Sequence, residues 1–209
     1  MPQQTFITSY INLTANSILL NGEVLFEQQG VSATAFLQAA YNHFGFNYPK
    51  FFKMDNLCKT GFIATELLLQ NQPGFAALKP EERGIIIQNA NSSLDTDIRY
   101  QETIATAPSP SLFVYTLPNV LIGELCIRHQ VKGETACFVF DIFDARFQEQ
   151  YVSLLPAHSA IKNCVAGWVD YYNGNAEAFL CLVNYTGNGL AEHTAANLDK
   201  LKQQAITTL

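Results

Sequence analysis

The sequence is poor in charge and has no block of basic residues. Only 14% of its 209 residues are charged, and 18 acidic residues outnumber 12 basic ones, for a formal net charge of -6. Proteins that bind nucleic acid gather lysines and arginines along one surface, where they neutralise phosphates. The scattered basic residues of this chain therefore predict no nucleic-acid partner.

Long hydrophobic runs are also absent. No apolar stretch approaches the ~18 residues that a membrane-spanning helix needs. The first residues, Met1-Pro2-Gln3-Gln4, carry none of the positive charge that opens a secretory signal. These two absences predict a cytoplasmic protein that does not associate with a membrane.

The motifs of metal, disulfide and nucleotide sites are missing too. The five cysteines are odd in number, lie in apolar surroundings and form no C-x-x-C pair, so we expect reduced core residues. No glycine-rich phosphate-binding motif occurs. The acidic pairs Asp95/Asp97 and Asp141/Asp144 are explained by a helix cap and a turn. We therefore expect no metal and no cofactor.

The chain instead has enough apolar residues for a sizeable core. With 48% hydrophobic content, residues 1–209 are expected to form a single domain. Hydrophobic periodicity predicts strands that alternate with helices, which favours an α/β sandwich with a largely buried sheet. The predicted strands are 6–13, a hairpin over 18–26 with an Asn-Gly turn, 84–88, 136–140 and 179–183; the predicted helices are 33–44, 54–69, 95–103, 157–172 and 188–201.

Polar residues indicate where two of these helices begin. Ser32 is placed to cap the first helix, and Asp55 stands near the positive end of the second. Between the two helices lies a set of aromatic residues that has the composition of an acyl or aryl pocket but is more typical of core. This set is Phe44, Phe46, Tyr48, Phe51 and Phe52.

One segment resembles a known family. Ser109–Glu124, which contains Leu117-Pro118-Asn119 and Gly123 and is followed by Gly133-Glu134, resembles the segment ahead of the nucleophile strand in β-ketoacyl synthases. Three weaker likenesses occur in the same order along the chain, so that the resemblance covers about residues 45–185. They are Tyr48–Asp55, Gly84–Ile87 followed by Asn91-Ser92-Ser93, and Ala166–Val183.

The resemblance implies a fold and a chemistry. The implied fold is the thiolase-like layered sandwich, a mixed central sheet with helices on both faces, equivalent to the N-terminal half of a ketosynthase. The implied activity is that of a 3-oxoacyl-ACP synthase, an acyltransferase of fatty-acid and polyketide biosynthesis. The family's Ala-Cys-x-x-Gly nucleophile turn is missing here, and so is the second half that supplies the catalytic histidines. Whether the chain is an enzyme therefore stays open.

Three residues remain as catalytic candidates. Counting back from Gly174 by the family's spacing places the nucleophile near Ala157-His158, where no cysteine stands. Cys137 follows Gly133 too closely and has the surroundings of a core strand, Cys164 falls inside a predicted helix, and His158 has those of a helix end. An acyl-accepting cysteine needs a thiolate and a neighbouring base. None of the three candidates shows that context.

The favoured function is a non-catalytic ketosynthase-like protein that works with fatty-acid or polyketide machinery, of which polyene assembly is one example. Its partner would be a ketosynthase-type chain or an acyl carrier protein. The alternatives are an acyl-transferring enzyme that uses Cys137 or Cys164, and a module that binds an acyl or aryl ligand. In the family the strand before the nucleophile joins two subunits, which implies a dimer through Thr135–Phe140, either a homodimer or a pair with a synthase. The alternative is a monomer in which 141–155 folds over that edge.

One further expectation concerns the packing around Gly123. A glycine one turn into a helix usually permits close backbone approach, so we expect Gly123→Val to overpack the structure.

Overall fold

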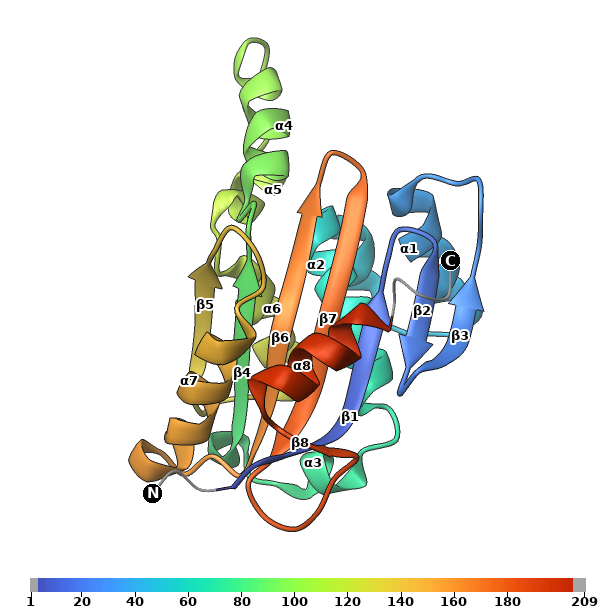
Figure 1. The fold of residues 1–209 in the computed structure, drawn as a ribbon. Helices are drawn as coiled ribbons and strands as arrows, with labels where there is room; N and C mark the ends of the chain where they lie inside the picture. Colours follow the sequence, from blue (N-terminus) through green and yellow to red (C-terminus); the bar gives the residue numbers. More distant parts are fainter. Residues whose placement is uncertain (1–3, 205–209) are drawn as a thin grey trace.

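The computed structural model describes residues 4–204 of the chain. A mixed sheet forms its centre (Figure 1), with the strand order β3-β2-β1-β7-β6-β4-β5 and with β8 paired to β1. β4 runs parallel to both β5 and β6, and the other pairs are antiparallel. The strands are β1 Phe6–Leu13, β2 Ser17–Leu20, β3 Glu23–Glu27, β4 Arg83–Asn89, β5 Thr135–Val139, β6 Asn163–Tyr172, β7 Asn175–Asn184 and β8 Ala191–Glu192.

Helices cover both faces of this sheet. α1, α2 and α6 lie on one face and α7 and α8 on the other, while α4 projects beyond the end of the sheet (Figure 1). The α-helices are α1 Ala33–His43, α2 Asn56–Leu69, α3 Pro73–Ala77, α4 Leu94–Ile104, α5 Pro110–Phe113, α6 Val120–His129, α7 Ala145–His158 and α8 Ala195–Gln203. Three short 3-10 helices are η1 Pro49–Lys53, η2 Pro80–Glu82 and η3 Val114–Thr116. The expected α/β class, with a mixed sheet between helices, is confirmed.

The sheet separates two hydrophobic cores. The larger one lies between the sheet and the helices α1, α2 and α6, and the smaller one lies under α7 and α8. The aromatic set expected to be core joins the larger cluster around Phe62, whose ring lies 5.3 Å from that of Tyr48 and 5.4 Å from that of Phe51. Phe52 is the exception, because its side chain is 52% exposed.

The local signals of turns and caps are confirmed. Asn21 and Gly22 both adopt positive φ, 53° and 87°, as a tight hairpin between β2 and β3 requires. The Ser32 side chain accepts a hydrogen bond from the backbone N–H of Ala35, and Asp55 caps α2 in the same way. Such caps satisfy N–H groups that the first helical turn leaves unpaired.

The predicted helix over 157–172 is wrong. α7 ends at His158, and the segment Asn163–Tyr172 is the central strand β6, joined to β7 by a tight turn at Asn173-Gly174. The segment is a nearly continuous apolar run buried on both faces, and such a run has no period that distinguishes strand from helix. Cys164 therefore belongs to a strand and not to a helix. The last helix also begins later than predicted, at Ala195, with Thr194 as its cap.

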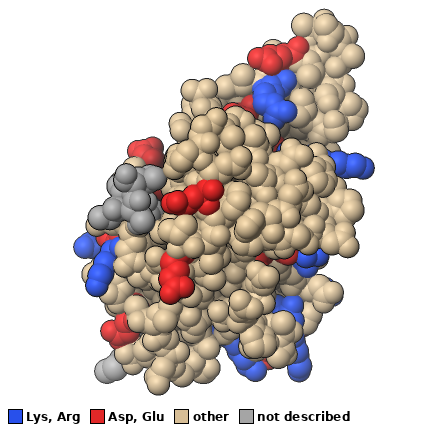
Figure 2. All heavy atoms as spheres, turned by 90° about the vertical axis from the view of Figure 1, so that its right-hand side faces the viewer, with Lys and Arg blue, Asp and Glu red and all other residues tan. Residues whose placement is uncertain are grey.

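The two edges of the sheet differ. β5 forms one edge and is half-exposed, so the prediction of a fully buried strand over 136–140 is wrong. β3 forms the other edge and carries Glu23 and Glu27 at its ends. Figure 2 shows the face on the β3 side, where charged side chains are scattered without a block of one sign.

Between residues 4 and 204 no single helix is long and apolar enough to cross a bilayer. One pair, Pro110–Thr116 with Val120–His129, passes the length and composition test together but is bent by 95°. Part of this pair belongs to the core, since Leu121 and Leu125 are buried.

Candidate functional site at the open edge of the sheet

The turn between β5 and α7 follows the segment that resembles the ketosynthases. Residues 140–144 connect the strand directly to the helix. This turn lies at the carboxyl ends of the parallel strands β4 and β5, where α/β sheets place their ligands. Ala157-His158, near which the family's spacing places the nucleophile, lies at the other end of α7 from this turn.

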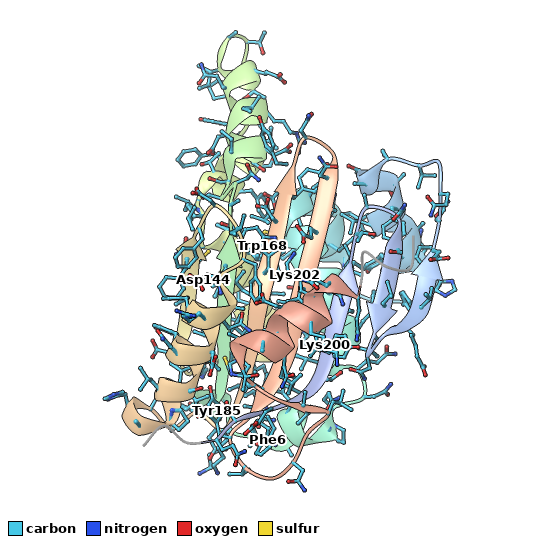
Figure 3. All side chains as sticks on the ribbon, in the orientation of Figure 1. Phe6, Asp144, Trp168, Tyr185, Lys200 and Lys202 are labelled. Atoms are coloured by element: carbon cyan, nitrogen blue, oxygen red, sulfur yellow. The ribbon has the colours of Figure 1, made fainter. Side chains whose placement is uncertain are left out.

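Two side chains hold the turn in place. The amide of Gln88 on β4 bonds to both backbone groups of Asp144: its Nε2 donates to the carbonyl (3.2 Å), and its Oε1 accepts from the N–H (2.9 Å). The Asp144 carboxylate in turn accepts from the N–H of Phe147 and caps α7, which Figure 3 shows beginning at this residue. Asp144, one of the acidic residues that the sequence analysis explained by a cap or a turn, is therefore the cap of α7.

The turn offers no nucleophile. Its five residues, Phe140-Asp141-Ile142-Phe143-Asp144, include neither a thiol nor a hydroxyl. A cavity of about 510 Å³ opens beside it, lined by residues 140–146 together with Ala195 and Asp199. The lining carries three carboxylates and one guanidinium, so it repels anionic groups more than it attracts them. Ile142 is 76% exposed at the tip of the turn.

The structure keeps the two cysteine candidates apart. Cys137 on β5 packs against the α6 side of the sheet and Cys164 on β6 against the α7 side, with β4 between the two strands. Cys164 is fully buried, and burial raises the pKa of both thiols. A raised pKa lowers the thiolate fraction of a cysteine at neutral pH and therefore slows its reactions.

His158 lies elsewhere. It is exposed at the end of α7 and lines a small pocket of about 240 Å³ with Glu134 and Tyr151. All five cysteines are free thiols, and Cys58 and Cys181 are buried like Cys164. Across the part of the chain that the structure describes, no group of three or more histidine, cysteine or acidic side chains is arranged to hold a metal.

A groove of about 680 Å³ separates α6 from β5. Most of its lining side chains are small: Gly123 and Cys126 lie on the α6 side, and Gly133, Thr135, Ala136 and Cys137 lie on and before β5. A Cβ atom placed on Gly123 would meet no other atom within 4 Å. The expectation of close packing at Gly123 is therefore wrong, because this glycine faces the groove. The predicted helix break at Leu117-Pro118-Asn119 is confirmed, since η3 ends at Thr116 and α6 begins at Val120.

The backbone of β5 leaves hydrogen-bonding groups unpaired at the edge. The N–H of Ile85 donates to the carbonyl of Glu134 (3.0 Å), and the N–H of Phe140 donates to that of Asn89 (2.9 Å). In a parallel pair, alternate residues bond to the neighbouring strand. The backbone groups of the odd-numbered residues of β5, Thr135, Cys137 and Val139, therefore point to the open edge.

Exposed apolar side chains lie on β5, on α6 and on the segment before α6. Leu117 precedes α6 and is 54% exposed, Ile127 on α6 is 66% exposed and Val139 is 56% exposed. The thiol of Cys137 lies 3.8 Å from the carbonyl oxygen of Pro118, which places the 117–118 segment beside the strand. An open strand edge with apolar surroundings favours pairing with another chain.

Sequence reasoning missed the residues that shape this site. Gln88 is an amide at the end of the apolar run Ile85–Ile87, and a lone polar residue in a buried strand is a signal that it has a specific partner. The sequence offers no comparable signal for the groove, because its lining comes from both α6 and β5.

Comparison with known proteins rests on structure alone. No protein-family model matches the chain. No curated protein matches it either. Among solved structures, 43 chains are similar to it.

Three of these structures illustrate the similarity. "The ishigamide ketosynthase/chain length factor" has a TM-score of 0.59 and 15% identity, over 87% of this chain and 62% of that chain. "AntDE:AntF (apo)", a type II PKS acyl-carrier protein in complex with its ketosynthase, has a TM-score of 0.58 and 12% identity, over 88% of this chain and 63% of that chain. The ketosynthase ApeO in complex with its chain length factor ApeC, from Xenorhabdus doucetiae, has a TM-score of 0.58 and 13% identity, over 95% of this chain and 90% of the matched chain.

The fold is therefore that of the ketosynthase and chain length factor proteins, a thiolase-like α/β sandwich, as the sequence resemblance implied. The chain spans less than two thirds of the length of the first two matched chains. It spans nearly the whole of the third.

Proposed function

We propose that this chain is a non-catalytic ketosynthase-like subunit that works with a ketosynthase-type chain or an acyl carrier protein in fatty-acid or polyketide assembly, polyene assembly included. The observation that supports this proposal is that the strand-to-helix turn after the ketosynthase-like segment, between β5 and α7, contains neither a thiol nor a hydroxyl. Decarboxylative condensation requires a thiolate to accept the acyl chain. A subunit that keeps the fold without the thiolate acts through its partner.

The open edge of β5 supports a position for the partner chain, beside this strand. A strand added there would satisfy the outward backbone groups of Thr135, Cys137 and Val139 and bury the exposed apolar side chains beside them. Two of the similar structures are complexes of a ketosynthase with a second protein, an acyl-carrier protein in one and a chain length factor in the other. The proposal takes residues 1–209 as one domain and places it in the cytoplasm, where thiols such as these five stay reduced.

The alternative of folding over the edge has little support. α7 follows β5 directly, but it packs on a face of the sheet: the ring of Phe138 lies 4.7 Å from that of Phe147 and 5.0 Å from that of Tyr151. Contacts on the face leave the backbone edge of β5 open. A charged residue at Phe138 would therefore disturb the α7 packing as well as the edge, and Val139 is the better position for a test.

Two other functions stay as alternatives. An acyl-transferring enzyme would use Cys137, because Cys164 is fully buried and out of reach of a carrier-bound substrate. Against this alternative, burial raises the pKa of the Cys137 thiol. A binding module for an acyl or aryl ligand would use the cavity beside the turn, where Phe140 and Phe143 are part of the lining.

Co-expression with the ketosynthase-type chain encoded nearest to its gene tests the proposal. We expect the two chains to co-purify and the mixture, but not this chain alone, to condense an acyl group with malonyl carrier protein. Val139→Lys should abolish co-purification, because it places a charge on the edge, whereas the matched control Leu190→Lys should not. Leu190 is similarly exposed, at 60%, and precedes β8, away from β5. Condensation by this chain alone, lost in Cys137→Ala, would overturn the proposal in favour of the enzyme.

A further inference from the structure

A polar pocket of about 330 Å³ lies at the end of the sheet opposite to the β5–α7 turn. Its lining comes from the ends of α2, α3 and α6 and from Arg83, the residue with which β4 begins. Figure 1 shows α3 at this lower end, whereas β4 runs away from it toward the turn. The lining combines apolar residues with donors of hydrogen bonds, and the residues that matter here are Leu69, Phe75, Arg83, Arg128, His129 and Gln130.

Arg83 carries a buried positive charge that lacks a full counter-charge. It is only 9% exposed, and its guanidinium donates to the backbone carbonyls of Ala76 (2.8 Å), Leu78 (2.5 Å) and His129 (2.8 Å). These carbonyls and the Phe75 ring, 5.4 Å away, fix its position and supply partial negative charge. Among the described residues no carboxylate pairs with Arg83, and its Nε–H has no acceptor. A buried charge in this state is costly, and an anion would relieve the cost.

Arg128 brings a second guanidinium to the same pocket. Its Nε and Nη2 donate to the two carboxylate oxygens of Glu66 (2.8 Å each), while its Nη1 donates to no group in the part of the chain that the structure describes. Nε2 of His129 lies 3.2 Å from Oε1 of Glu66 without forming a hydrogen bond. Burial lowers the pKa of His129 to about 4, so its ring is neutral. Two guanidinium groups against one carboxylate leave one positive charge in excess.

This lining has the chemistry of a phosphate site. Guanidinium groups bind phosphate through a fork of N–H donors, and two of them can bind different oxygens of one phosphate. The pocket is larger than a free phosphate and lies at the lower end of the range of small-molecule sites. The chain as a whole has a net charge of -6 and does not attract anions, so a positive pocket on it is a local feature.

We infer that this pocket binds a phosphate group, free or in a small ester, with Arg83 and Arg128 as the charged groups that hold it. Leu69 and Phe75 would contact the organic part of an ester. The inference goes beyond the proposed function and does not depend on it, because the pocket lies at the other end of the sheet from the turn.

Titration calorimetry with inorganic phosphate, at constant ionic strength, tests the inference. We expect saturable binding of one phosphate per chain. Gln130→Glu should weaken it at least about tenfold, because the change places a like charge in the pocket. Gln130 is exposed, so this isosteric variant should fold like the wild type. The matched control is Gln150→Glu, the same change at an exposed position of α7 on the other face of the sheet, which should bind phosphate like the wild type.

Glu66→Gln should act in the opposite direction. It removes the carboxylate that competes with phosphate for Arg128, so the affinity should rise. The absence of saturable binding to the wild type, an unchanged affinity in Gln130→Glu or a weaker one in Glu66→Gln would overturn the inference.

Two further titrations identify the source of the phosphate. Glycerol 1-phosphate that binds more tightly than inorganic phosphate supports an ester, and equal or weaker binding supports free phosphate. Acetate that binds more tightly than either would refute the assignment of a phosphate group.

Discussion

Two glycines on facing helices should respond oppositely to the same substitution. Gly61 on α2 and Gly123 on α6 both lie inside helices, where replacement of glycine by alanine stabilises by about 0.5–1 kcal/mol. At Gly123 the new Cβ meets nothing, so Gly123→Ala should realise this gain. At Gly61 it would lie 2.4 Å from Cδ1 of Leu121, a side chain that is only 1% exposed and would have to shift.

The clash at Gly61 outweighs the gain in helix propensity. Overpacking of a buried site costs about 1–3 kcal/mol. Gly61→Ala should therefore change stability by between about 0 and 2.5 kcal/mol in the destabilising direction, and the two variants should differ by about 1–3 kcal/mol. For a chain of this size each kcal/mol shifts the melting temperature by roughly 2–4 °C.

Thermal unfolding and urea titration of both variants measure the difference. The further substitution Leu121→Val should remove part of the penalty of Gly61→Ala, because the two side chains are in contact and their effects are not additive. A Gly61→Ala variant as stable as Gly123→Ala would show that α2 and α6 do not approach as closely as the structure has them.

Three further outcomes are expected. Asp55→Ala removes both the cap of α2 and the hydrogen bond from the Thr96 hydroxyl (2.8 Å), and should cost at least about 1–2 kcal/mol in urea unfolding, whereas a neutral result would rule out the cap. Burial lowers the pKa of His193 to about 4. The unfolded chain therefore binds this proton first, and about 3 kcal/mol of stability should be lost as the pH falls from 6.5 to 4. His193→Leu should make that pH dependence shallower, and an unchanged slope would contradict the assignment. An alkylating thiol reagent should modify Cys137 in the folded protein and Cys164 only after unfolding, as mass spectrometry of the digested protein would show; modification of Cys164 in the folded state would contradict its burial.

Short-range signals predicted most of the fold. Asn-Gly turns, serine and aspartate caps and the apolar run of β4 act within a few residues, and the elements they predicted are present. The prediction of a helix over 157–172 is wrong because a strand buried on both faces, such as β6, and a buried helix both appear in the sequence as a continuous apolar run. The turn at Asn173-Gly174 carries the same hairpin signal as Asn21-Gly22, with positive φ at both residues.

The candidate site was less predictable than the fold. The absence of the family's Ala-Cys-x-x-Gly motif could be seen in the sequence, but the place of the β5–α7 turn in the fold could not, because it depends on which segments are strands and which are helices. The role of Gly123 depends on what lies opposite it across the groove, and a spacing rule contains no such information. The close approach is made instead by Gly61, on the other helix, which the apolar stripe of the predicted helix over 54–69 contains.

The opposite edge of the sheet limits how far pairing can extend. β3 is five residues long and ends in Glu23 and Glu27, and short strands with acidic residues resist the addition of another strand. A sheet that can pair with another chain at β5 but not at β3 ends an assembly. Once a chain has bound at β5, no second edge is left where a further chain can pair. Assemblies made through β5 should therefore stop at two chains and not propagate into a fibre.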